Sequence, residues 1–132
     1  GLPDQSKSDW LADLKQAVEY DPNHISCYML TYEKGTPLHS SREEGRVQPL
    51  AEDNVRTLFE TTIDFLEDHK YFQYEISNFA RIGNDGKPRI SRHNLKYWTL
   101  APYIGLGPSA HSFIEPQRYW NVSGVDSYIE AI

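Results

Sequence analysis

The sequence has a single cysteine and no long hydrophobic run. With Cys27 alone, a disulfide within the chain and a metal cage made only of cysteines are excluded. This residue lies in the apolar stretch of residues 25–30, so we expect a buried small side chain rather than a reactive thiol. Because no stretch approaches the roughly 18 apolar residues that a spanning helix needs, we expect no membrane span. Sparse cysteine also favours a cytoplasmic protein.

The chain also lacks a basic face. Its 19 acidic residues outnumber 13 basic ones and give a net charge of −6. We therefore expect no nucleic-acid partner, because phosphate binding needs clustered lysine and arginine. Only residues 81–92 show a loose positive cluster, which we interpret as a solvated loop. With 39% hydrophobic and 24% charged residues, the composition is that of a globular protein, and its length suits a single domain over residues 1–132.

The hydrophobic pattern predicts helices that alternate with strands. Ser6 followed by Asp9 forms a capping box, and apolar residues then recur at helical spacing. The predicted helices cover residues 7–20 and 51–69, the strands residues 25–32, 72–76, 103–113 and 118–122, the long loop residues 78–94, and a last helix starts at Asp126. This order predicts an α/β fold with a mainly parallel sheet and helices on one face. We expect a further strand before Gly1 and more chain beyond both ends.

Polar side chains follow the predicted strand over residues 72–76. In parallel α/β folds, ligand-binding groups gather where strands reach their carboxyl ends. Glu75, Ser77 and Asn78 are therefore predicted ligand contacts, and Thr31 occupies the matching edge of the earlier strand. The alternative is that Ser77 and Asn78 only cap the loop that follows.

Two histidines stand in sequence contexts that favour a binding role. His93 lies among aromatic residues beside the long loop, and His111 follows small residues that let a ligand or another backbone come close. Each could bind a metal or form only structural hydrogen bonds. Gly105 and Gly107 lack the third glycine of a dinucleotide site, and Pro108 removes an amide donor, so nucleotide binding is not indicated. No nucleophile elbow of a serine hydrolase is present.

Five sequence blocks in one order carry a family resemblance. They are GLPDQ (1–5), ISxYxLTxExGTPL (25–38), YEISNFA (74–80), HNxxYW (93–98) and GLGPxAHS (105–112). Together they resemble the oxygen-independent coproporphyrinogen III oxidase-like radical S-adenosylmethionine (SAM) proteins, and within these the HemW branch of heme chaperones. Any one block would be a weak signal, whereas five in register cover nearly the whole chain.

The resemblance implies the second half of a (β/α)6 partial barrel of the TIM type. In full-length members, a [4Fe-4S] cluster held by three cysteines reduces SAM and releases a deoxyadenosyl radical. True oxidases then decarboxylate the propionates of coproporphyrinogen III, whereas the HemW branch binds and delivers heme. The cluster cysteines would lie upstream of Gly1 and a C-terminal domain would follow the chain. We therefore expect this segment to be inactive by itself and to hold no tightly bound cofactor.

The resemblance also assigns individual residues. Thr31 and His111 fall where the oxidases contact a second SAM molecule. His93, Tyr97 and Trp98 belong to the block that is characteristic of the HemW branch, and they are implied heme contacts. An imidazole ligand flanked by aromatic rings suits an iron porphyrin.

The leading hypothesis is that the chain is part of a radical SAM enzyme of porphyrin and heme biosynthesis. The alternatives are part of a heme carrier without oxidase activity, which the block over residues 93–98 favours, and a structural domain without a site. A tetrapyrrole, either heme or coproporphyrinogen III, is the partner under the first two. An unpaired strand edge, over residues 25–32 or 72–76, also predicts a dimer.

Overall fold

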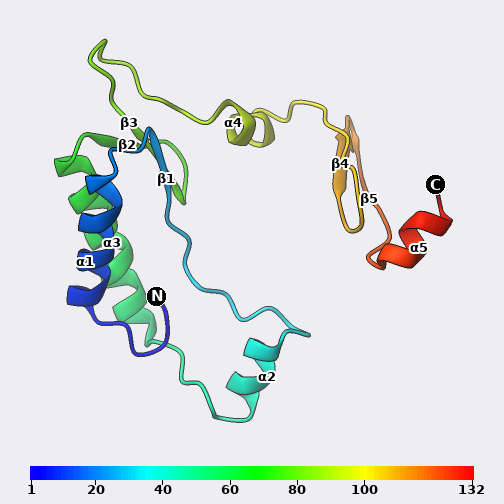
Figure 1. Ribbon diagram of the computed structural model, residues 1–132, viewed down its shortest axis with the longest axis horizontal. Coiled ribbons are helices and arrows are strands. Elements are labelled where there is room, and N and C mark those ends of the chain that lie inside the picture. The colour runs from blue at the N-terminus through cyan, green and yellow to red at the C-terminus, as the bar shows by residue number, and fades with distance from the viewer. The chain divides into compact units, whose positions relative to one another are not determined.

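The computed structural model describes all residues from 1 to 132. The chain divides into two compact units, Gly1–Ile90 and Ser91–Ile132. The first contains α1 (Lys7–Glu19), β1 (His24–Ser26), α2 (Pro37–Glu43), α3 (Glu52–Asp68), β2 (Tyr71–Gln73) and β3 (Asn78–Arg81) (Figure 1). The second contains α4 (Arg92–Trp98), β4 (His111–Ile114), β5 (Gln117–Trp120) and α5 (Val125–Glu130).

The two long helices begin and end where the sequence predicts. The Ser6 hydroxyl accepts a hydrogen bond from the Asp9 amide at 3.2 Å, and the Asp9 carboxylate accepts one from the Ser6 amide at 3.0 Å. This reciprocal capping box fixes the start of α1. In α3, Leu58, Thr62 and Leu66 are buried at four-residue intervals, so one stripe of the helix faces the interior. The prediction of helices over 7–20 and 51–69 is confirmed.

The sheet of the first unit is antiparallel, so the predicted parallel sheet is wrong. Its strand order is β1-β3-β2, and β3 pairs antiparallel with both neighbours. The physical reason is the connection between β2 and β3, which comprises only residues 74–77. Such a short connection can join antiparallel strands only, since parallel strands need a crossover of a dozen or more residues. The fold class remains a mixture of α and β.

Several local predictions for the first unit are also wrong. The apolar stretch 25–32 is a strand only up to Ser26, because its remaining residues have no strand partner. The predicted loop over 78–94 contains β3, which pairs on both sides. A short helix, α2, was not predicted; the Thr36 hydroxyl caps it by accepting from the His39 amide at 3.2 Å, and Pro37 occupies its first position.

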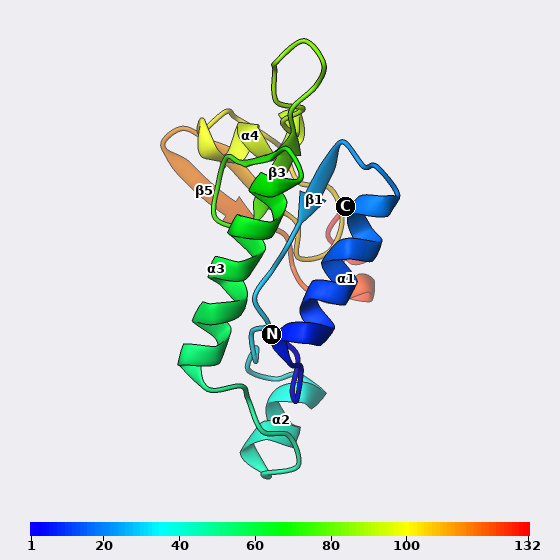
Figure 2. The same ribbon diagram turned by 90° about the vertical axis from the view of Figure 1, so that its left-hand side faces the viewer.

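The core of the first unit lies between the long helices and one face of the sheet. Leu14 of α1, Leu66 of α3, Tyr71 of β2 and Phe79 of β3 form a buried cluster. Figure 2 shows α1 and α3 running side by side. Because both helices contribute to one cluster with Tyr71 and Phe79, they cover the same face of the sheet, as predicted. Cys27 packs against this core, and burial raises the pKa of its thiol to about 11, which fits a small hydrophobic side chain.

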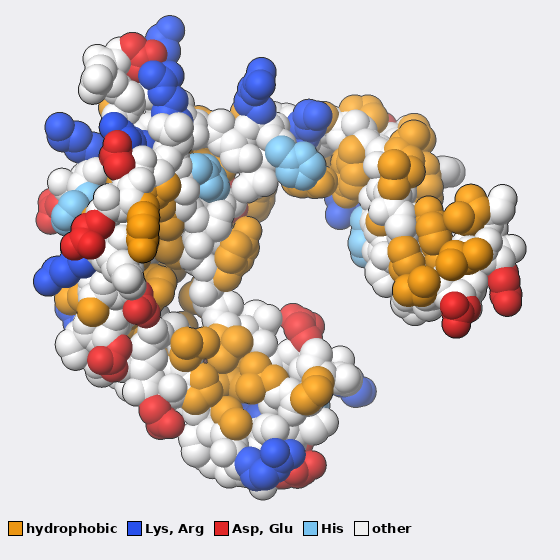
Figure 3. Space-filling model, in the orientation of Figure 1, with side chains coloured by type: hydrophobic (Ala, Val, Ile, Leu, Met, Phe, Trp, Pro, Cys, Tyr) orange, Lys and Arg blue, Asp and Glu red, His pale blue; other side chains and the backbone are white.

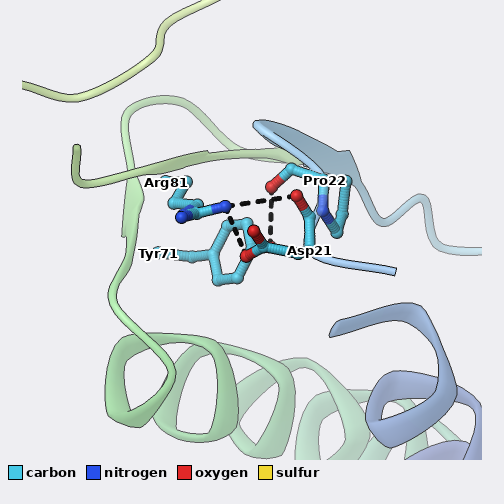
Figure 4. A network of polar contacts seen from close by, with 4 residues as sticks. All are labelled: Asp21, Pro22, Tyr71 and Arg81. Atoms are coloured by element: carbon cyan, nitrogen blue, oxygen red, sulfur yellow. Dashed lines mark hydrogen bonds and ion pairs between the residues drawn. The ribbon is translucent and has the colours of Figure 1, made fainter. Parts of the chain in front are cut away.

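A polar network joins the end of α1 to the sheet (Figure 4). The Tyr71 hydroxyl donates a hydrogen bond to the Pro22 carbonyl oxygen at 2.7 Å. The Arg81 guanidinium donates to the Asp21 carbonyl oxygen at 3.2 Å and forms an ion pair with the carboxylate of Asp21. Burial raises the pKa of the Tyr71 hydroxyl, so this hydroxyl stays a neutral donor. The network sets the turn from which β1 starts.

The second unit consists of short elements around a hairpin. Strands β4 and β5 pair antiparallel, with His111 opposite Trp120 and Ser112 opposite Tyr119. The predicted strand over 103–113 is formed only from His111 onward, although Tyr103 makes a bridge to Phe113. Helix α4 falls at the end of the predicted loop, where the sequence reading missed it. Ser112, at 1% exposure, is the buried residue of this unit.

Candidate functional site

The second unit contains a groove that brings together both candidate histidines. The groove has a volume of about 470 Å³. It is lined by His93, Lys96 and Tyr97 of α4, by Tyr103, Ile104, Gly105 and Leu106, and by Ala110 and His111 at the start of β4. The sequence pattern gives no reason to expect His93 and His111 together, and the fold places them on one surface.

Helix α4 presents its groove residues by simple helical spacing. His93, Lys96 and Tyr97 are three and four positions apart, which places them on one face of the helix. The Ser91 hydroxyl accepts from the Asn94 amide at 3.3 Å and starts the helix. At the other end, the Ala101 amide donates to the Lys96 carbonyl oxygen at 2.9 Å, and Leu100 takes a φ of 54°. These contacts cap both ends of a helix with only seven residues.

A row of rings runs along the groove from α4 to the hairpin. The Tyr97 hydroxyl oxygen lies 3.1 Å from Nε2 of His93, and the two rings meet edge to face at 5.2 Å. Tyr97 meets Tyr103 in the same way at 4.9 Å, and Tyr103 lies 6.4 Å from Phe113. A hydrogen bond at one ring nitrogen orients an imidazole and leaves the other nitrogen available to a ligand.

The opposite side of the groove depends on a close backbone contact. The Gly105 amide donates to the Ser112 hydroxyl at 3.0 Å. A Cβ atom on Gly105 would lie 2.1 Å from the carbonyl oxygen of His111, so only glycine fits there. The His111 ring lies 5.8 Å from that of Trp120, its partner across the hairpin. The sequence prediction that small residues here allow a close approach is confirmed for the backbone.

Trp98 is not among the groove residues. It is the last residue of α4, and its side chain is exposed. Conversely, the sequence reading missed Lys96 and Tyr103, which do line the groove. For Lys96 the signal is its position three residues after His93 in a helix. The sequence analysis predicts no helix there, because the predicted loop ends at residue 94 and the next predicted strand starts at residue 103. For Tyr103 no local signal existed, because its place depends on the bridge to Phe113.

The predicted ligand contacts in the first unit have structural partners. The Glu75 carboxylate accepts from the Ser77 amide at 2.9 Å, and the Ser77 carbonyl oxygen accepts from the Cys27 amide at 2.8 Å. The Asn78 side chain is buried and accepts from the Ser26 hydroxyl at 2.5 Å. These bonds hold the turn between β2 and β3 to β1, which favours the capping alternative for Ser77 and Asn78. A ligand role for these residues stays a prediction.

Thr31 and His111, the implied SAM contacts, belong to different units. Thr31 is exposed in the segment between β1 and α2, and His111 lies in the groove of the second unit. A second SAM site therefore stays a prediction.

Of the implied cofactors, the residues of this chain suit heme and do not suit a [4Fe-4S] cluster. A [4Fe-4S] cluster does not fit, because the chain has one cysteine and no group of three or more metal-binding side chains. The side chains of the groove are chemically suited to an iron porphyrin, because two imidazoles adjoin tyrosine rings and the aliphatic side chains of Ile104 and Leu106. Heme sites use imidazole nitrogens as iron ligands and aromatic and aliphatic side chains against the porphyrin.

Comparison with known proteins gives a consistent set of relatives. The chain is 40% identical over 117 residues to the heme chaperone HemW of Buchnera aphidicola subsp. Schizaphis graminum, covering 86% of this chain and 28% of that protein. It is 34% identical over all 132 residues to the heme chaperone HemW of Bacillus subtilis, covering 34% of the latter. A mitochondrial radical S-adenosyl methionine domain-containing protein 1 of Danio rerio is 37% identical over 115 residues, which are 87% of this chain and 25% of that protein. No protein-family model matches.

A solved structure supports the fold. The chain matches coproporphyrinogen III oxidase (HemN) of Escherichia coli, described as a radical SAM enzyme, with a TM-score of 0.69 at 18% identity. The match covers 98% of this chain and 31% of that one. None of the helices is long and apolar enough to cross a membrane, and the relatives include mitochondrial proteins, so a cytoplasmic location stays a prediction. The chain spans between 25% and 34% of the curated relatives it matches. It is homologous, as a segment, to HemW and to the radical S-adenosyl methionine domain-containing proteins.

Proposed function

We propose that the protein containing this chain is a heme carrier, and that the groove of the second unit forms part of its heme site. The observation that carries the proposal is the convergence of His93, Tyr97 and His111 on one groove. The relatives named heme chaperones supply the ligand class, since they match 86% to 100% of this chain.

The groove offers the interactions that an iron porphyrin needs. An imidazole nitrogen binds the iron, and rings and aliphatic side chains pack against the planar macrocycle. Under the proposal, His93 supplies the nitrogen, and the Tyr97 hydroxyl, 3.1 Å from its Nε2, orients the ring. His111 stands on the same groove and is the next candidate if His93 proves structural. Trp98 is exposed at the end of α4 and does not line the groove. Under the proposal it would contact a part of the heme that extends beyond the groove.

An oxidase acting on coproporphyrinogen III has weaker support. The solved oxidase shares the fold at 18% identity, and a fold is compatible with many activities. The chain itself contributes no cluster ligands, so any radical chemistry would depend on residues elsewhere in the protein. Assays of porphyrinogen decarboxylation and of heme transfer separate the two functions. A purely structural role would require that the protein bind neither heme nor SAM.

The test is a histidine substitution in the full-length natural protein that contains this sequence. His93→Ala should weaken heme affinity at least about tenfold, the size of effect typical for metal-site residues, and should change the heme absorbance. The matched control is His39→Ala in α2, outside the groove. Circular dichroism establishes that both variants are folded. Unchanged absorbance and affinity in His93→Ala would leave His93 a structural histidine.

A further inference from the structure

The groove carries a positive charge that no carboxylate balances. Its lining includes one cationic side chain, Lys96, and two histidines, but no aspartate or glutamate. This is unusual in a chain with 19 acidic and 13 basic residues. A cation without a carboxylate nearby favours a ligand that brings its own negative charge.

The ammonium group of Lys96 is free to bind such a ligand. The ion pairs of the structure join Arg46 to Glu44, Arg56 to Glu60, Arg81 to Asp21 and Arg89 to Asp85. Lys96 takes part in none of them. Its side chain forms no hydrogen bond either, and its backbone carbonyl accepts from the Ala101 amide and the Thr99 hydroxyl. The long, flexible stem of a lysine lets its charge follow a partner along the groove.

The position of Lys96 relative to His93 matches the positions of the carboxylates and the iron in a heme. Residues three apart on a helix have Cβ atoms roughly 5–6 Å apart, so both side chains reach into the same groove. A heme has its iron at the centre of the macrocycle and its propionate carboxylates at the rim. An imidazole for the iron and an ammonium for a carboxylate, one helical turn apart, match this pattern.

We propose that Lys96 binds a propionate carboxylate of the tetrapyrrole and so selects ligands that keep this group free. The inference rests on the proposed heme site and adds a residue that orients the macrocycle. It predicts that the charge of Lys96 favours hemin over its dimethyl ester, which has no free carboxylate.

The experiment compares four proteins with two ligands. Wild type, Lys96→Glu, Lys96→Arg and the charge control Lys87→Glu are made in the natural protein that contains this sequence and titrated with hemin and with hemin dimethyl ester at low ionic strength. Lys87 belongs to the first unit and does not line the groove. Lys96→Glu should weaken hemin binding about five- to tenfold, the size expected for losing an exposed ion pair and adding repulsion. Lys96→Arg should stay within about twofold of wild type, because the charge is kept. The difference should shrink as salt screens the pair.

The ester separates charge recognition from damage to the helix. If Lys96 binds a propionate, Lys96→Glu and wild type bind the ester equally, and Lys87→Glu binds both ligands as wild type does. An equal loss for hemin and ester in Lys96→Glu would overturn the inference, because it would reflect a disrupted α4. Normal hemin binding by Lys96→Glu, together with a loss in His93→Ala, would overturn the inference and leave the heme site standing. Absence of hemin binding to wild type would overturn both.

Discussion

Two phenylalanines in the same sheet give a sharp test of where the core lies. Phe79 in β3 is 1% exposed and belongs to the cluster with Leu14, Leu66 and Tyr71. Phe72 in β2 is 49% exposed. Both are strand residues of the same type, so truncation to alanine changes strand propensity similarly in each. The difference between the two variants therefore reports burial.

The expected magnitudes differ by a factor of about three. Phe79→Ala removes a fully buried ring and should cost about 3–5 kcal/mol in the free energy of unfolding. Phe72→Ala removes a ring that keeps about half of its contact with water, so its transfer term should be about 1–1.5 kcal/mol. Because domains of this kind are stable by roughly 5–15 kcal/mol, the first variant should lose a large fraction of its stability.

Trp10 provides a probe for the first unit alone. Its indole nitrogen donates to the Thr62 hydroxyl at 2.6 Å, and its ring packs against the core cluster. The other two tryptophans, Trp98 and Trp120, lie in the second unit and can be replaced by phenylalanine. Urea unfolding followed by Trp10 fluorescence then gives the midpoint for each variant. Equal midpoints for Phe79→Ala and Phe72→Ala would refute the assignment of the core face.

Two further predictions concern the groove and the sheet edges. Gly105→Ala should widen the groove and lower hemin affinity, because its Cβ would meet a backbone atom of His111 that cannot rotate away. The control is Gly124→Ala, whose Cβ meets the Ser127 hydroxyl at 3.2 Å. Equal hemin affinities of the two variants would contradict the close approach of Gly105 to His111. The outer strands β1 and β2 each pair on one side only, so we expect concentration-dependent dimers through one of these edges. Light scattering that reports a monomer at every concentration would speak against pairing.

The helices of the first unit could be predicted because their signals are local. A capping box starts α1, and an apolar stripe lies within each of the two segments. The strand directions in the sheet could not be predicted in the same way, because they depend on the connection between β2 and β3. That turn is held by the Glu75 carboxylate on the Ser77 amide and by Asn78 on Ser26, contacts between residues that look like ligand groups in the sequence.

Only some of the groove residues, and not their arrangement, could be predicted from the sequence. His93 and His111 were both selected, yet their common groove depends on Gly105 lying against β4. The only sign in the sequence that Gly105 approaches the backbone of β4 is its small size. Lys96 was overlooked because a seven-residue helix has too few turns to show a hydrophobic stripe.

The construction of the second unit suggests how a ligand would act on it. Helix α4 contains no buried residue, and a helix of this length is unstable by itself in water. It is held by its caps and by the contact between Tyr97 and Tyr103. Apolar side chains remain at the surface over the hairpin and α5 (Figure 3), with Trp120 at 68% exposure. A ligand that contacts both α4 and the Tyr103 side of the groove stabilises the state in which these two are together. We therefore expect heme binding to stabilise the folded form of α4, because heme would contact both α4 and the segment around Tyr103.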